Sequence, residues 1–163
     1  MGPMGSGSGF ALPLSQRQTL VWSLLREGQS VATIAETLKT TRQFVNQTKL
    51  AAESKLSGAL MDAAQANQIQ TTKVYPNDGL LLGYHPGLGR RAIITYSSKL
   101  GIKVWYWFDK PEEVKDKVFL SQTRAYLFEI TKERGLDIEG ASRMHPAKLA
   151  QLVFSELIPE LKA

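Results

Sequence analysis

Apolar residues recur at spacings of one helical turn through the first third of the chain, and this pattern predicts three helices. The first helix follows a Ser15 cap and ends at Gly28, and the second follows a Ser30 cap. The third begins at Thr41, after a turn that contains Lys39. We expect the helices to share a core of Leu20, Val21, Leu24, Leu25, Val31, Ile34, Ala35, Leu38, Phe44 and Val45.

The third helix is expected to continue far beyond its polar start. From Arg42 to Ile69 the chain has no proline and a single glycine, Gly58. A helix of that length would be about 42 Å long. Small and apolar residues repeat along it at spacings of four and three, which predicts a packed seam. We interpret the seam as a homodimer interface, with packing on the same chain as the alternative. The seam consists of Ala52, Leu56, Ala59, Ala63 and Ala66.

After Gln70 the pattern becomes alternating, and turn residues interrupt it at short intervals. Four strands are predicted over 72–75, 79–84, 91–97 and 102–108, separated by Pro-Asn-Asp-Gly, His-Pro-Gly-Leu-Gly and Lys-Leu-Gly. A helix capped by Asp109, with Pro111 in its first turn, and a helix that opens at Pro146 follow. We therefore expect an α+β fold whose antiparallel sheet carries helices on one side.

The change of pattern at Gln70 also predicts the domain organisation. Residues 14–69 are expected to form a helical domain, and residues 70–163 an α+β domain for sensing or assembly. Residues 1–13, which begin MGPMGSGSG, are interpreted as a flexible leader and tag remnant. They lack the apolar core of a signal peptide, and no apolar run in the chain is long enough to span a bilayer. We expect a cytoplasmic protein without membrane contact.

Charge and composition narrow the classes of function. Of the net charge of +5, +2 falls in residues 15–70, +4 in residues 71–110 and −1 in residues 111–163. This distribution permits nucleic-acid binding. The chain has no cysteine, and its two histidines, His85 and His145, lie far apart. We expect no disulfide, metal site or cofactor, and we find no pairing of nucleophile and base that would indicate an enzyme.

The outer side of the third helix carries the candidate chemistry. It is rich in Arg, Asn and Gln, and no acidic residue occurs between Lys39 and Ala52. In the DNA major groove Arg pairs with the edge of guanine, and Asn or Gln with the edge of adenine. The candidates for base readout are Arg42, Gln43, Asn46 and Gln47. Phosphate contacts are expected from Arg17, Ser30, Lys39, Thr41 and Lys49.

The stretch L-S-x-R-Q-x-x-V-x-x-L-L-x-x-G-x-S-x-x-x-I-A-x-x-L-x-T-T-R-x-x-V resembles the helix-turn-helix of sigma-factor region 4 and LuxR-type regulators, and in particular that of archaeal Tfx-type transcriptional regulators. Thr41, Arg42 and Val45 match the T-S/T-R-x-x-V start of the recognition helix in the Tfx-type family. The alanine-rich continuation is matched by Ala51, Ala52 and Ala59. The resemblance covers about a third of the chain. It implies a dimeric, sequence-specific regulator of transcription, whose signal is not carried over because the segment after Gln70 does not match.

Two other functions stay open from the sequence. The chain would be an architectural protein that coats DNA if it showed little preference for sequence. It would be a protein-interaction module of the transcription machinery if the helical bundle bound no DNA. A two-fold dimer that reads DNA would favour a palindromic site with half-sites about 34 Å apart.

Two candidate sites lie in the C-terminal region. Arg90 and Arg91 follow a glycine-rich turn and would suit an anion or a DNA phosphate, with a plain hairpin turn as the alternative. Trp105 and Trp107 alternate along the last strand and would line a pocket for an unknown small-molecule effector, with a sheet core as the alternative.

Overall fold

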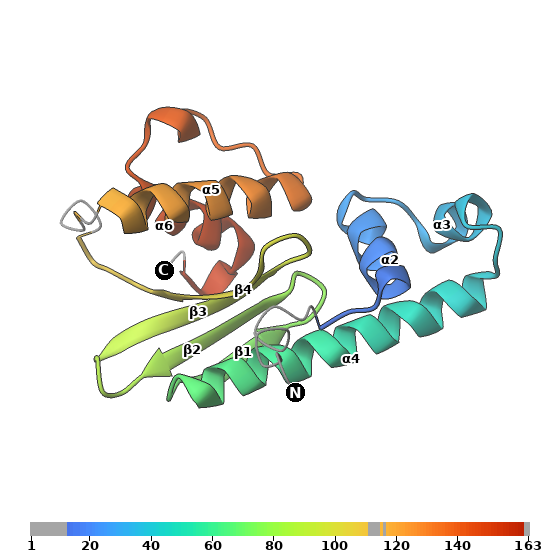
Figure 1. The fold of residues 1–163 in the computed structure, drawn as a ribbon, viewed down its shortest axis with the longest axis horizontal. Coiled ribbons are helices and arrows are strands. Elements are labelled where there is room, and N and C mark those ends of the chain that lie inside the picture. The colour runs from blue at the N-terminus through green and yellow to red at the C-terminus, as the bar shows by residue number, and fades with distance from the viewer. Residues whose placement is uncertain (1–12, 111–114, 116, 162–163) are drawn as a thin grey trace, which may run out of the picture.

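The computed structural model describes residues 13–110, 115 and 117–161 of the chain. This part has an α+β fold, in which three helices precede a four-stranded antiparallel sheet and two further helices follow it (Figure 1). The helices are α2 (Gln16–Arg26), α3 (Val31–Thr37), α4 (Arg42–Ala66), α5 (Lys117–Glu133) and α6 (Pro146–Leu157). The strands are β1 (Gln70–Tyr75), β2 (Leu80–His85), β3 (Arg90–Ser97) and β4 (Gly101–Tyr106). Two short 3₁₀ helices, η2 (Ala141–Arg143) and η3 (Pro159–Leu161), flank α6.

The predicted caps of the first three helices are confirmed. Ser15 and Gln18 form a reciprocal capping box at the start of α2. The hydroxyl oxygens of Ser30 and Thr41 accept hydrogen bonds from backbone N–H groups in the first turns of α3 and α4. Gly28 has a φ of +93° after α2, a conformation that costs a glycine little. The local chemistry of the sequence therefore fixes where each helix starts.

The predicted core of these helices is partly wrong. Val21 and Val45 are buried among α2, α3 and α4 as expected. Leu20 and Phe44, however, are 45% and 39% exposed. Trp22, which was not assigned to the core, is buried instead. Its ring lies edge-to-face with the ring of Tyr96 in β3. Helix α2 has two neighbours, the other helices and the sheet, and this turns Leu20 outward.

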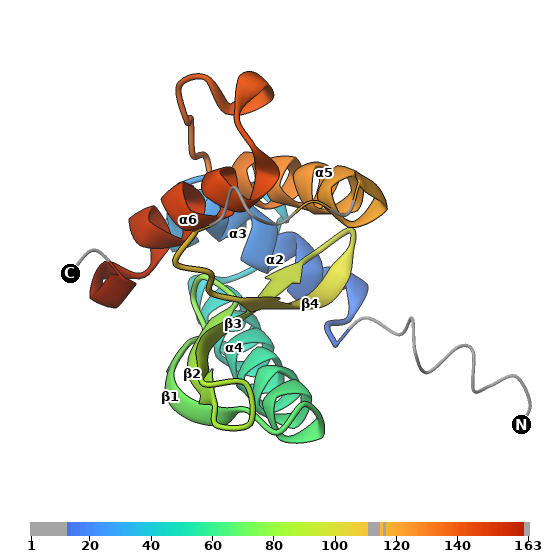
Figure 2. The same ribbon diagram turned by 90° about the vertical axis from the view of Figure 1, so that its left-hand side faces the viewer.

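The sheet is a meander with the strand order β1-β2-β3-β4, as predicted. Helices cover both of its faces, so the expectation of helices on one side is wrong (Figure 2). The register explains why. One row across the strands, Leu82, Ile93 and Trp105, faces α5 and α6. The next row, Leu81, Ile94 and Val104, faces α4.

Helix α4 spans the molecule, with its first turns beside α2 and α3 and its last turns on the sheet (Figure 1). Ala52 and Leu56 are 1% and 0% exposed, in a cluster with Trp22 and Tyr96 of the same chain. Ala59 is partly buried, and Ala63 packs against the cluster that α4 forms with the sheet. The first half of the seam is thus covered within one chain, as in the alternative prediction. In its second half Ala66 is exposed, and Leu60 and Ala64, which lie outside the predicted seam, are buried instead.

Polar contacts fix the helical end to the rest of the fold. Arg26 of α2 forms an ion pair with Asp78 in the β1–β2 turn, at 2.6 Å between Nη1 and Oδ1. Arg134, just after α5, donates hydrogen bonds to the backbone carbonyls of Asp78 and Tyr96, the latter at 2.8 Å. Its guanidinium carbon lies 5.6 Å from the ring centroid of Trp22. Helices α2 and α5 therefore share one junction at the β1–β2 turn.

Several predictions concern the ends of elements. Helix α5 begins at Lys117 and Lys115 is not helical, so Asp109 does not cap this helix. Pro111 lies outside the described residues, as does the leader apart from Pro13. The last helix opens at Pro146, as predicted, with His145 as its cap. None of the helices in the described part of the chain combines the length and apolar character needed to cross a membrane.

Candidate nucleic-acid interface

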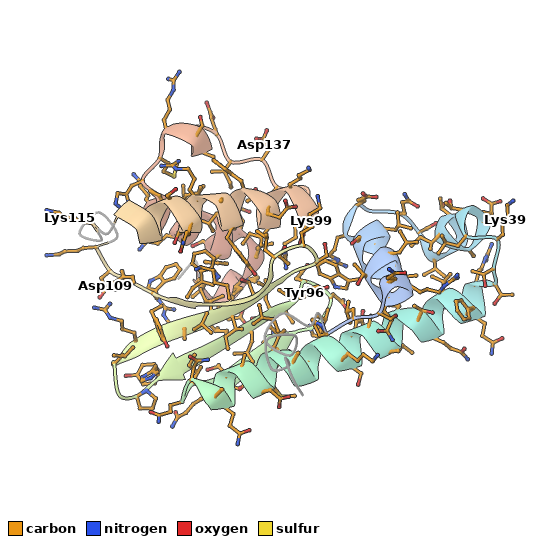
Figure 3. All side chains as sticks on the ribbon, in the orientation of Figure 1. Lys39, Tyr96, Lys99, Asp109, Lys115 and Asp137 are labelled. Carbon is orange, nitrogen blue, oxygen red and sulfur yellow. The ribbon has the colours of Figure 1, made fainter. Side chains whose placement is uncertain are left out.

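Helix α3 and the first turns of α4 form one end of the molecule and project away from the sheet (Figure 1). Lys39 lies at this end, in the turn that joins the two helices (Figure 3). Its φ of +55° is unusual for a residue with a side chain, and it closes the connection in few residues. The end therefore presents the start of a long helix to solvent.

The four predicted base-readout residues lie together on this projecting end. Arg42, Gln43, Asn46 and Gln47 are all exposed, whereas Val45 among them is 0% exposed. Positions four apart on a helix lie on the same side, one turn above each other. The side chains therefore line two successive turns of one outward side of α4, and no other element of the described structure covers them.

The predicted phosphate contacts at the helix caps differ in what they leave free. Thr41 is exposed, and its Oγ1 accepts a hydrogen bond of 3.0 Å from the backbone N of Phe44. Ser30 accepts from the backbone N of Thr33 and donates its own hydroxyl to Thr33 Oγ1 at 2.9 Å. The hydroxyl proton of Ser30 is thus already used, so it suits a phosphate less well than Thr41 does.

The predicted cationic contacts also differ. Lys39 is exposed. Lys49 is partly buried and pairs with Glu53 one turn later, at 3.5 Å between Nζ and Oε2. Arg17 on α2 is exposed, and its guanidinium carbon lies 5.6 Å from the ring centroid of Phe44. Arg17 is thereby held beside the outer side of α4, next to the base-readout residues.

Phe44, like Leu20, is a surface residue that the sequence pattern wrongly placed in the core. Its ring is 39% exposed and lies under Arg17. Leu50, two turns further along α4, is 62% exposed. The helical repeat alone does not determine whether these two residues face the core or the solvent. The packing of α2 against α4 decides this. The outer side of α4 is therefore less polar than the sequence predicted.

Arg90 and Arg91 lie at the start of β3, in the sheet rather than at the α3 end. The Arg90 guanidinium donates to the backbone oxygen of Trp107 at 3.1 Å and lies 4.6 Å from the ring centroid of Phe108. Arg91 lies 5.4 Å from the ring centroid of Trp107. Each arginine thus lies over an aromatic ring of the segment just after β4, and the structure does not join them to the exposed side of α4.

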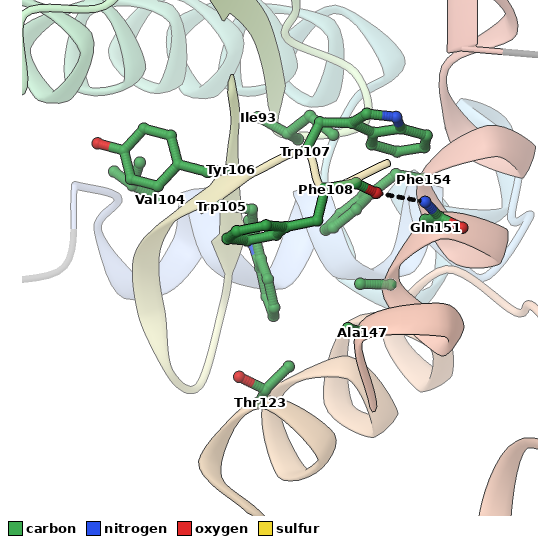
Figure 4. A pocket seen from close by; sticks show the side chains of 11 residues that line it. Ile93, Val104, Trp105, Tyr106, Trp107, Phe108, Thr123, Ala147, Gln151 and Phe154 are labelled. Carbon is green, nitrogen blue, oxygen red and sulfur yellow. Dashed lines mark hydrogen bonds between the residues drawn. The ribbon is translucent and has the colours of Figure 1, made fainter. Parts of the chain in front are cut away.

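Trp105 and Trp107 come together at a cavity between β4 and the pair α5 and α6 (Figure 4). Trp105 is mostly core, packed edge-to-face on Tyr126 and Phe154, and its indole N–H donates to Thr95 Oγ1 at 2.8 Å. The hydroxyl of Tyr126 donates to the backbone oxygen of Gly101 at 2.7 Å, and burial raises the pKa of this phenol. Both predicted readings, a pocket wall and a sheet core, apply to this cluster.

Comparisons of the chain with protein-family models, with curated proteins and with solved structures find no match. The resemblance to Tfx-type regulators therefore stays a prediction that depends on the motif alone.

Proposed function

We propose that this protein is a sequence-specific, double-stranded DNA-binding regulator of transcription that inserts the first two turns of α4 into the major groove. One observation carries the proposal. Arg42, Gln43, Asn46 and Gln47 are exposed together around the buried Val45, at a projecting end of the molecule. Their side chains have the hydrogen-bonding groups that discriminate base edges. A helix of about 10–12 Å diameter fits a groove about 12 Å wide.

The surroundings of α4 supply the contacts that would position it. Arg17 and Lys39 are exposed cations that both precede the base-readout residues along the chain. Thr41 marks the helix start, whose backbone N–H groups favour an anion. Such contacts to phosphates give affinity without sequence information. Lys49 can contact a phosphate only after its ion pair with Glu53 breaks, so it contributes less to DNA affinity than a free lysine would.

Pairing of two chains belongs to this proposal, but through a surface other than the predicted seam. Leu50 and Met61 on α4 are 62% and 45% exposed, and they offer apolar area to a second copy. The same exposed apolar residues, with Phe44, favour the second candidate function, a module that binds a protein of the transcription machinery. The DNA proposal is preferred because polar residues with base-reading chemistry occupy the very start of the helix.

Two variants test the assigned roles. Arg42→Lys keeps the charge but loses the planar fork that pairs with guanine. The affinity for a duplex obtained by selection from random sequences should therefore fall about tenfold, while the affinity for a scrambled duplex hardly changes. Lys49→Ala should weaken both duplexes alike and lower the salt dependence by less than about one ion, because Lys49 must first leave Glu53. Fluorescence anisotropy over a range of salt concentrations measures both, with Lys55→Ala, an exposed change later in α4, as the matched control. Equal losses on both duplexes for Arg42→Lys would contradict base readout.

A further inference from the structure

The cavity between β4, α5 and α6 has the size and lining of a small-molecule site. Its volume is about 290 Å³. Cavities of roughly 150 Å³ with apolar walls hold a benzene molecule, so this one has room for two fused rings. The described residues around it include Ile93, Trp105, Trp107, Phe108 and Phe154 (Figure 4). Flat aromatic walls of this kind favour a flat apolar guest.

One polar group in the lining makes no hydrogen bond within the described part of the chain. The side-chain Oγ1 of Thr123, on α5, is buried and makes no hydrogen bond, and the whole residue is 2% exposed. A buried hydroxyl without a partner is unfavourable, because it has lost its hydrogen bonds to water and gained none in return. By contrast, Gln151 of α6, another polar side chain at the cavity, donates its amide to the backbone oxygen of Phe108 at 2.7 Å. Thr123 is thus the group that a guest would satisfy.

The charge of the lining restricts the class of guest. None of the described lining residues carries a charge at neutral pH. Their polar groups are the hydroxyls of Thr123 and Tyr106, the amide of Gln151 and the indole N–H groups of Trp105 and Trp107. Transferring an ion into such surroundings without a counter-charge is very costly, whereas a neutral ring loses little. A neutral guest with one hydrogen-bonding group fits both the walls and the unpartnered hydroxyl.

We propose that this cavity binds an uncharged, planar bicyclic aromatic molecule whose single polar group hydrogen-bonds to Thr123. The site lies in the sheet and the two C-terminal helices, so it stands or falls independently of DNA binding. Indole is a suitable probe, because it has this shape and one N–H donor. Indene is its matched partner, because it has nearly the same shape and no donor.

Isothermal titration calorimetry of the full chain with each probe, without DNA, tests the proposal. Indole should bind in a saturable manner with one site per chain, and more tightly than indene. Thr123→Val removes the hydroxyl at nearly constant volume and should weaken indole by about two- to tenfold while leaving indene unchanged. Ala150→Leu, which places a larger side chain in the cavity lining, should abolish binding of both probes. Ala125→Leu, an exposed change on α5, is the control and should have no effect.

Three results would overturn the inference. No saturable binding of indole by the wild-type chain would remove the site. Binding that survives Ala150→Leu in a chain with a wild-type circular dichroism spectrum would place the guest elsewhere. Equal weakening of indole and indene by Thr123→Val would remove the hydrogen bond assigned to that residue.

Discussion

At the scale of single residues, Arg134 is the polar group on which the junction of the molecule depends. Its side chain is only 2% exposed, and burial lowers the pKa of its guanidinium. The group is accommodated because backbone carbonyls of Asp78 and Tyr96 accept its hydrogen bonds and the acid of Glu133 lies 3.9 Å away. A charged donor held in this way is costly to lose, because its acceptors then stay buried without partners.

We predict that Arg134→Met destabilises the fold by about 3 kcal/mol, since at least two buried carbonyls lose their donor. Urea denaturation followed by circular dichroism measures this free energy of unfolding. Lys132→Met, an exposed change two residues earlier, should shift it by less than about 0.5 kcal/mol. A loss for Arg134→Met no larger than that of the control would show that the junction does not need the guanidinium.

The helix caps are the features that the sequence predicted best at the scale of single residues. Ser15 with Gln18, Ser30 and Thr41 were identified as caps from their own side chains and short spacings, and a cap needs no distant partner. The role of Arg134 could not be found in this way. Its acceptors are 56 and 38 residues away along the chain, so only the folded arrangement brings them together.

At the scale of elements, α4 combines two tasks that the sequence presents as one repeat. Its start carries the exposed polar side, and its later turns place Leu56 and Leu60 against other elements of the same chain. The periodicity of small and apolar residues predicted correctly that the side of the helix with Ala52 and Leu56 is buried, although Leu60 and Ala64 take the place of Ala66 towards its end. It could not predict what covers it, because a second copy and the sheet of the same chain need the same pattern.

Two leucines on α4 test whether the side of the helix with Leu56 is covered within one chain. Leu56→Ala removes a side chain that is 0% exposed, so we predict a loss of about 3 kcal/mol in the free energy of unfolding. Leu50→Ala, at a position 62% exposed that we propose for pairing of two chains, should cost less than about 0.5 kcal/mol at concentrations where the chain is a monomer. Urea denaturation at several protein concentrations measures both. If the difference in free energy of unfolding between the wild type and Leu56→Ala disappeared when both proteins were diluted, the seam would lie between two chains instead.

At the scale of the whole molecule, a three-layer body holds a helical end that projects from it (Figures 1 and 2). The predicted α+β class and strand order are correct, because turn sequences and alternation are local signals. The covering of both sheet faces was missed, since it depends on α4 returning to a sheet that comes later in the chain. Helix α5 carries Thr123 at the cavity and is followed directly by Arg134 at the junction with α2, so one element connects the cavity with that junction.

The central claim is that the start of α4 reads DNA sequence, and selection from a pool of random duplexes tests it most directly. The full chain is mixed with the pool at moderate salt, and bound duplexes are recovered, amplified and sequenced over several rounds. We predict enrichment of one short motif, and a loss of preference at one base pair of that motif when Arg42→Lys is used in place of the wild type. Recovery of duplexes without any enriched motif, or no recovery even at low salt, would contradict the claim.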